Sequence, residues 1–198
     1  MHLKNTKEHL RFFFSKDINL IYISVFFMTL AESMIEIFVP IYLYGLGYSI
    51  QWIIFFYLLS SIGFVAFSLY GAKIASDIGL KKSILISTPF LLAYYAGLKF
   101  ISVKGEFSVY LFFIMPFLLS FRGIFYNYGF HLNYLKHSDD KKRGRELSFM
   151  GILSLFAALL SPLFSGLIIK FFGYGMLFLV GGLLLILGAF ILFFSVDH

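Results

Sequence analysis

Residues 172–196 read FGYGMLFLVGGLLLILGAFILFFSV, twenty-five positions without one charged side chain. At a rise of 1.5 Å per residue, a helix of this length is about 37 Å long and crosses the ~30 Å hydrocarbon core of a bilayer. The stretch does not alternate polar and apolar residues, as the strands of a membrane β-barrel do. It therefore predicts a membrane-spanning α-helix and places the chain among the all-α membrane proteins.

The whole chain shares this apolar character. Of its 198 residues, 60% are hydrophobic and only 13% are charged, and 28 are Phe. A soluble domain is about half apolar and about a quarter charged, so lipid is the expected solvent here. The net charge of +6 then indicates contact with anionic headgroups of the lipid bilayer rather than with nucleic acid. The sequence contains no Cys, which excludes disulfides, thiol catalysis and thiolate metal sites.

Five more apolar stretches precede the last one, so we expect six transmembrane helices in all. Glycines stand at or near each junction, where they allow the chain to turn. The expected spans are residues 18–44, 50–72, 83–103, 107–134, 147–170 and 172–196, and the junction glycines are Gly45, Gly47, Gly79, Gly105, Gly144 and Gly173. This divides the chain into an N-terminal segment, 1–17, and a bundle, 18–196, with cytoplasmic loops at 73–82 and 135–146.

Positive charge is concentrated between the spans. Three patches, Lys4–Lys16, Lys73–Lys82 and Lys136–Arg145, hold twelve of the sixteen Lys and Arg residues. Membrane bundles keep such residues in their cytoplasmic loops, because translocating them is unfavourable. Six crossings put both termini on the side of these patches, and the loops on the opposite side hold three lysines at most. We therefore expect cytoplasmic N- and C-termini in the plasma (inner) membrane.

The six spans divide into two sets of three. Because three is odd, the second set enters the membrane from the opposite face, which is an inverted-topology arrangement common in secondary transporters. Two inverted three-helix repeats are therefore expected on grounds of topology, since the residues of the two sets are not visibly alike.

The segment that joins the second and third spans reads GAKIASDIGLKK over residues 71–82. It resembles the signature loop of the major facilitator superfamily, in which a helix-two Gly is followed by Asp-Arg-x-Gly-Arg-Arg/Lys. The matching residues are Gly71, Asp77, Gly79, Lys81 and Lys82. The Arg that normally follows the Asp is absent, and the spacing from Asp to Gly is one residue shorter. From the residues alone, a solvated basic turn that obeys the charge rule is the alternative.

Three more segments resemble motifs of the same superfamily. The loop before the fifth span contains RGR over residues 143–145, although a basic loop that contacts lipid is equally typical, and the fourth span contains Arg122 followed by glycines. The fifth span contains SPLFSG over residues 161–166, which resembles the antiporter motif Gly-Pro-x-x-Gly-Gly through Pro162 and Gly166. Ordinary packing of small residues is the alternative for this motif.

The resemblance extends over all six spans and matches the N-terminal half of a twelve-helix transporter. It implies a major facilitator-type half bundle in which the first and fourth spans touch. It also implies a second six-helix half, which would be in the same chain, in a split partner or in a second copy.

The first span contains two carboxylates, Glu32 and Glu36. A charged group in hydrocarbon costs several kcal/mol, so it normally faces a cavity or a partner. At spacing i, i+4 the two lie on one helix face, which Thr29, Ser33 and Pro40 extend. Two carboxylates this close can share one proton. This arrangement predicts proton or cation coupling, or the binding of a cationic substrate; a structural ion pair that locks the first and fourth spans is the alternative.

Arg122 in the fourth span is the expected partner of these acids. Measured from the outer end at 1.5 Å per residue, Glu32 lies about 18 Å deep and Arg122 about 22 Å deep. Asn127 lies on a second polar stripe of the same span, together with Ser120. We therefore expect the substrate- or proton-coupling site at Glu32, Glu36, Arg122 and Asn127.

These observations predict a secondary active membrane transporter, or its N-terminal half, that moves a small solute by alternating access, with proton-coupled efflux as one mode. Two other classes remain open. A non-transporting membrane partner or scaffold would not need buried carboxylates. An intramembrane enzyme would need a motif such as Gly-x-Ser-x-Gly or His-Glu-x-x-His, and the sequence contains neither. We therefore expect neither an enzyme nor a bound cofactor.

Overall fold

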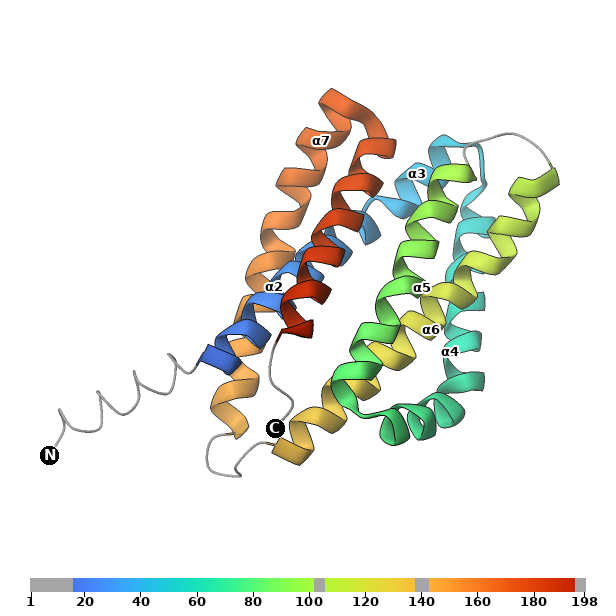
Figure 1. Ribbon diagram of the computed structural model, residues 1–198. Coiled ribbons are helices and arrows are strands. Elements are labelled where there is room, and N and C mark those ends of the chain that lie inside the picture. Colours follow the sequence, from blue (N-terminus) through green and yellow to red (C-terminus); the bar gives the residue numbers. More distant parts are fainter. Residues whose placement is uncertain (1–15, 102–105, 138–142, 195–198) are drawn as a thin grey trace, which may run out of the picture.

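The protein is a bundle of helices, and the structure describes residues 16–101, 106–137 and 143–194 (Figure 1). In this computed structural model the helices are α2 (Lys16–Glu36), α3 (Val39–Gly45), α4 (Ile50–Ile78), α5 (Leu80–Phe100), α6 (Glu106–His137) and α7 (Arg143–Phe193). The described residues form no strand, and five helical segments among them are long and apolar enough to cross a membrane. This architecture agrees with the predicted class, an all-α multi-pass membrane protein.

The first predicted span, residues 18–44, is not one helix. α2 ends at Glu36, and a two-residue turn separates it from α3. Pro40 explains the break, because proline has no N–H to donate to the carbonyl four residues earlier, and its ring clashes with that carbonyl. The carbonyl that loses its donor belongs to Glu36. In the turn that follows, the Phe38 N–H donates to the carbonyl three residues earlier, that of Ile35, at 2.9 Å. The break therefore places Glu36 at the C-terminal end of α2.

The predicted loops at 73–82 and 135–146 are wrong in their extent. α4 and α5 run through the first of them and are interrupted only at Gly79, which has φ 84° and ψ 162°. A positive φ favours glycine, which lacks a Cβ. The polar residues on either side are compatible with helix, so the helices continue beyond the apolar stretches that set the predicted boundaries. α6 and α7 likewise extend into the second loop, of which residues 138–142 lie outside the described residues.

α7 folds back on itself at Gly173. A straight helix of its 51 residues would be about 76 Å long, more than twice the ~30 Å hydrocarbon thickness. Gly173 has φ 78° and ψ 177°, which interrupts the helical backbone, and the two arms run antiparallel in Figure 1. We call residues 143–172 the first arm and residues 174–193 the second arm. The interruption lies where the sequence predicts a junction, between the stretches 147–170 and 172–196.

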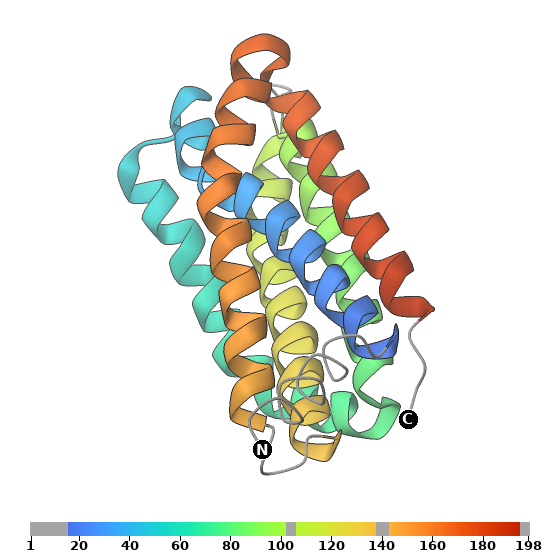
Figure 2. The same cartoon turned by 90° about the vertical axis from the view of Figure 1, so that its left-hand side faces the viewer.

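The helices pack in two groups that meet along one side (Figures 1 and 2). α2 packs mainly on α7, whereas α6 packs on α4 and α5, and contacts between α5 and α7 join the two groups. Buried apolar side chains from every helix form the core; they include Met28, Met34, Ile35, Leu43, Phe56, Leu91, Leu98, Met115 and Leu177.

Small residues allow α2 to lie close to α7. A Cβ added at Gly188 would be 2.8 Å from Met28 Cγ and 3.1 Å from the carbonyl oxygen of Ser24. The Ser24 hydroxyl donates a hydrogen bond to the Gly188 carbonyl at 2.7 Å, and the Ser165 hydroxyl donates to the Met34 carbonyl at 2.8 Å. The Ser24 bond reaches the second arm of α7, and the Ser165 bond comes from the first arm. Small residues and polar side chains that bond across helices are typical of packing in lipid.

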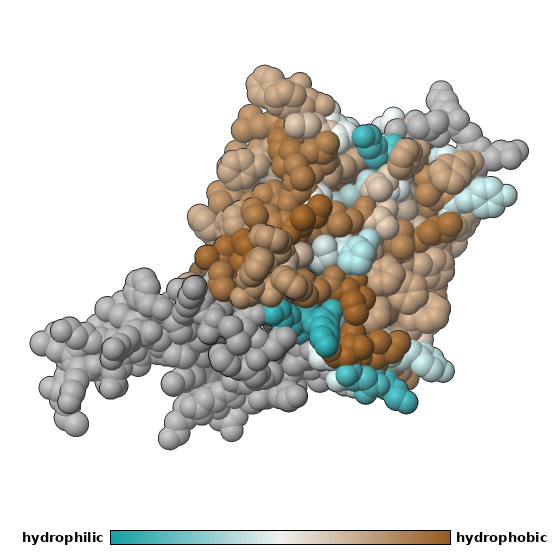
Figure 3. Space-filling view, viewed as in Figure 1, coloured by the Kyte–Doolittle hydropathy of each residue, from teal (hydrophilic) through white to brown (hydrophobic). Residues whose placement is uncertain are grey.

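Apolar side chains cover most of the face seen in Figure 3, as expected of a surface in contact with lipid. The turn between α4 and α5 lies at one end of the bundle, and the bend of α7 and the last residues of α5 lie at the other (Figure 1). By their positions in these helices, the exposed Lys73 and Lys82 lie toward the first end, and the exposed Lys99 and Lys170 toward the second. The side of the membrane that each end faces stays a prediction, and the other basic residues of the predicted groups at 4–11, 104 and 141–142 lie outside the described residues.

Substituting Gly188 tests the close approach of α2 and α7. We expect Gly188→Ala to destabilise the bundle by about 1–3 kcal/mol, because the added methyl group overlaps α2. Gly151→Ala is the matched control, since a Cβ there meets nothing within 4 Å and Ala is a better helix former by about 1 kcal/mol. Thermal unfolding in detergent should give a lower midpoint for the first variant and an equal or higher one for the second. Equal midpoints in the two variants would contradict the close contact.

Candidate functional site

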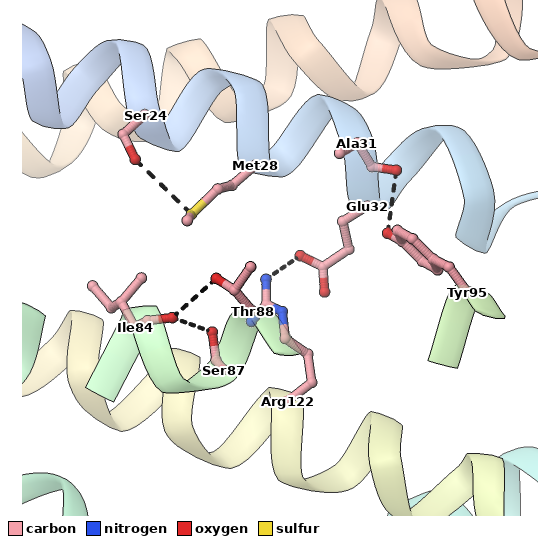
Figure 4. Close-up of polar contacts among 9 residues, drawn as sticks. All are labelled: Ser24, Met28, Ala31, Glu32, Ile84, Ser87, Thr88, Tyr95 and Arg122. Atoms are coloured by element: carbon pink, nitrogen blue, oxygen red, sulfur yellow. Dashed lines mark hydrogen bonds and ion pairs between the residues drawn. The ribbon is translucent and has the colours of Figure 1, made fainter. Parts of the chain in front are cut away.

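Two of the three charges predicted inside the membrane, Glu32 and Arg122, form an ion pair. Glu32 lies on α2 and Arg122 on α6, and Arg122 Nη2 donates to Glu32 Oε2 at 2.6 Å (Figure 4). The Arg122 side chain is 2% exposed and the Glu32 side chain is 23% exposed. Each charge compensates the other in a region where an isolated one would cost roughly 2.5–3.5 kcal/mol or more. The partnership that the two depths predicted is therefore confirmed.

The guanidinium of Arg122 also lies against an aromatic ring. Its Cζ is 3.8 Å from the ring centroid of Tyr126, which follows one helical turn later on α6. A cation over a tyrosine face is stabilised by about 2 kcal/mol when both groups are removed from water. Thr29, about one turn before Glu32 on α2, has a side-chain hydrogen bond with Tyr126. The ion pair is therefore supported by contacts one turn away on both helices.

α5 completes the surroundings of the pair, and Figure 4 shows its side chains facing α2 across the site. The Tyr95 hydroxyl donates to the Ala31 carbonyl of α2 at 3.4 Å. Ser87 and Thr88 are buried, and their hydroxyls donate to a carbonyl of α5 itself. The Nε of Arg122 is buried and has no hydrogen-bond partner among the described residues. The Nε–H of the guanidinium is therefore a buried donor that the described part of the chain does not use.

The second carboxylate, Glu36, has a different environment. It is exposed at the C-terminal end of α2, one turn after Glu32, and it has no hydrogen bond or ion pair with the described residues. It is within electrostatic range of Glu32 and Arg122. The tyrosine hydroxyls within its range are those of Tyr57, Tyr94 and Tyr95. The site thus combines one compensated ion pair with one accessible acid.

The signature-like segment forms the end of α4, the turn and the start of α5, at one end of the bundle (Figure 1). Gly71 is buried and packs on α6, where an added Cβ would overlap a side chain. Gly79 makes the turn, Asp77 and Lys82 are exposed, and Lys81 Nζ lies 6.0 Å from an aromatic ring of α7. None of the side chains that the structure describes forms an ion pair with Asp77.

The remaining predicted residues do not contact the ion pair. Asn127 is exposed on α6, and no described contact joins it to the charges. Pro162 is exposed, and a Cβ added at Gly166 would meet nothing within 4 Å. Within residues 161–166, in the first arm of α7, Ser161 and Ser165 are the two buried residues. The structure therefore groups the two glutamates and the arginine, and leaves the other predicted residues apart from them.

The tyrosines around the charges were not predicted. The chain has 13 Tyr, and composition alone does not distinguish those near the site. Tyr126 could have been found from helical spacing, because it stands four residues after Arg122. Tyr57, Tyr94 and Tyr95 belong to other helices, so no local spacing connects them with the first span.

Comparison with known proteins adds no assignment, because no protein-family model and no curated protein matches the chain. Among the described residues, no three metal-ligating side chains gather at one place. Function is therefore inferred from the packing and the charges.

The ion pair predicts non-additive effects on stability. Glu32→Gln leaves the buried guanidinium without a counter-ion, and losing one partner of a buried pair costs about 3–5 kcal/mol. We expect the double variant Glu32→Gln/Arg122→Gln to recover most of this loss, because neither charge remains. Lys170→Gln, which removes an exposed charge, should leave the unfolding midpoint unchanged. Additive losses in a double-mutant cycle of unfolding free energies would contradict the pairing.

Proposed function

We propose that the chain is a secondary active membrane transporter of the major facilitator type, or the N-terminal half of one, that moves a small solute by alternating access. The observation that carries the proposal is the Glu32–Arg122 pair with a second acid, Glu36, one turn away. Ionisable residues inside membrane segments are costly, and they commonly mark ion or substrate pathways. A membrane scaffold would not need them.

In this proposal the two arms of α7 are separate crossings, and α2 with α3 is the first, so that the five long apolar segments would make six crossings. The packing supports two inverted repeats, because exchanging the first three crossings for the last three retains the main contacts between helices. α2 packs on the two arms of α7, as α6 packs on α4 and α5. The same exchange pairs the third crossing with the sixth and the first with the fourth. It therefore leaves two contacts in place, the one between α5 and the second arm and the ion pair between α2 and α6. Inverted repeats of this kind occur in many transporters.

In the proposed orientation, the end that carries Gly79 and Lys82 is cytoplasmic, because basic residues are retained on that side. Both termini then lie in the cytoplasm, and the membrane is the plasma (inner) membrane. Alternating access requires a second bundle against which this one rocks. That second six-helix half would belong to the same chain, to a split partner or to a second copy.

The chemistry of the site favours coupling between a proton and a cationic solute. A carboxylate binds either one, but not both together, so the two compete for the same group. Such competition makes the exit of one accompany the entry of the other, which is the basis of exchange. The fixed positive charge of Arg122 lies within range of Glu36 and limits how strongly a cation is held there.

Single cysteines test the proposed topology, because the sequence itself contains none. We expect a membrane-impermeant maleimide, added to intact cells, to label Lys170→Cys. Lys82→Cys, at the opposite end of the bundle, should be labelled only after the membrane is permeabilised. Labelling of both variants from the same side would contradict a six-crossing arrangement.

Solute-driven proton movement tests the function. Wild-type protein is reconstituted in liposomes whose interior is acidic and contains a pH-sensitive dye. Tetramethylammonium, glucose or gluconate is then added outside. We expect the cation to discharge the pH gradient faster than in protein-free liposomes, because protons leave as the cation enters. Glu36→Gln should abolish this response, while Lys170→Gln should retain it. A response that survives in both Glu32→Gln and Glu36→Gln would remove the carboxylates from coupling.

A further inference from the structure

The two acids of α2 differ in whether they can change their charge. Glu32 is tied to Arg122 at 2.6 Å, and the arginine is only 2% exposed. A guanidinium stays protonated at any physiological pH. Neutralising Glu32 would therefore leave a buried positive charge without a counter-ion. This cost favours retaining the Glu32–Arg122 ion pair.

Glu36 is under no such constraint. It is exposed, it has no ion pair or hydrogen bond with the described residues, and it stands at the last position of α2. The C-terminal end of a helix carries partial negative charge on its free carbonyls. Glu32, one turn earlier, adds a full negative charge. A proton on Glu36 relieves both of these repulsions, so its charge can change without disturbing the ion pair.

The groups within electrostatic range of Glu36 come from three other helices and from its own. Arg122 of α6 is the one positive charge within its range among the described residues, and it is already paired with Glu32. The others are the hydroxyls of Tyr57 on α4 and of Tyr94 and Tyr95 on α5. None of these tyrosines carries a positive charge, so Arg122 is the only described cation in range of Glu36.

From this geometry, and resting on the proposed function, we propose that the two acids have separate roles. Glu36 takes up and releases the coupled proton, whereas Glu32 remains the permanent counter-ion that positions Arg122. In the first step, hydronium on one side of the membrane gives a proton to the Glu36 carboxylate and becomes water. In the second step, the carboxylic acid returns that proton to water on the other side. The Glu32–Arg122 bond is retained in both steps.

Reaction with dicyclohexylcarbodiimide tests this division. The reagent adds to a protonated carboxyl group in an apolar environment and rearranges to a stable N-acylurea, which retains the mass of the whole reagent. We expect wild-type protein in liposomes to carry one such adduct within α2, at Glu36, and to lose it as the buffer is made more alkaline. Tandem mass spectrometry of the α2 peptide distinguishes Glu36 from Glu32. Glu36→Asp should retain the adduct, and Glu36→Gln should lose it.

Arg122 provides the second measurement. Arg122→Gln removes the counter-ion, so an adduct should now form at Glu32 as well, whereas Arg122→Lys keeps a positive charge and should leave Glu32 unmodified. An adduct on Glu32 in the wild-type protein, or no adduct on either acid, would overturn the proposal. Labelling needs no transport, so a correct pattern of adducts in a protein that moves no solute would count against the proposed function alone.

Discussion

A guanidinium that is 2% exposed inside an apolar bundle needs a counter-ion, and Arg122 has one in Glu32, ninety positions earlier in the chain. The helices that carry these residues pack mainly on different neighbours, α2 on α7 and α6 on α4 and α5. The pair therefore links the two groups of helices at a point where few backbone contacts do so. Each charge alone would be strongly unfavourable there, so the bundle is stable only when both helices present their charges at the same depth.

Small residues make that alignment possible. Lipid provides no hydrophobic drive for helices to associate, so close backbone contact and hydrogen bonds between helices must hold the bundle together. Gly188 removes the side chain that would separate α7 from α2. Buried serine hydroxyls donate to carbonyls of neighbouring helices, from Ser24 and Ser165 between α2 and α7, from Ser83 to α6, and from Ser120 to α4. These contacts set the spacing at which Glu32 and Arg122 meet.

The helix break at Pro40 gives the site its asymmetry. Without it, Glu36 would be an interior helical residue, one turn from Glu32. With it, Glu36 ends α2 and is exposed, while Glu32 remains in the helix and in its ion pair. Local covalent chemistry, the missing N–H of proline, thus separates two otherwise identical carboxylates. The sequence contains this signal, yet the apolar residues on both sides of Pro40 conceal it when the whole of 18–44 is taken as one helix.

Several features followed from the sequence alone, because they depend on residues in their order along the chain. Hydropathy predicted the apolar helices, Gly79 and Gly173 marked two turns, and counting residues put Glu32 and Arg122 at similar depths. The loops were predicted too long, because hydropathy reports where lipid ends, whereas a helix ends where its backbone is interrupted. Only the tertiary structure decided which helices are neighbours, which tyrosines surround the charges, and that Glu36 is exposed and outside the ion pair. Those outcomes depend on how each helix is rotated about its axis, and that rotation is set by packing between segments distant in the chain.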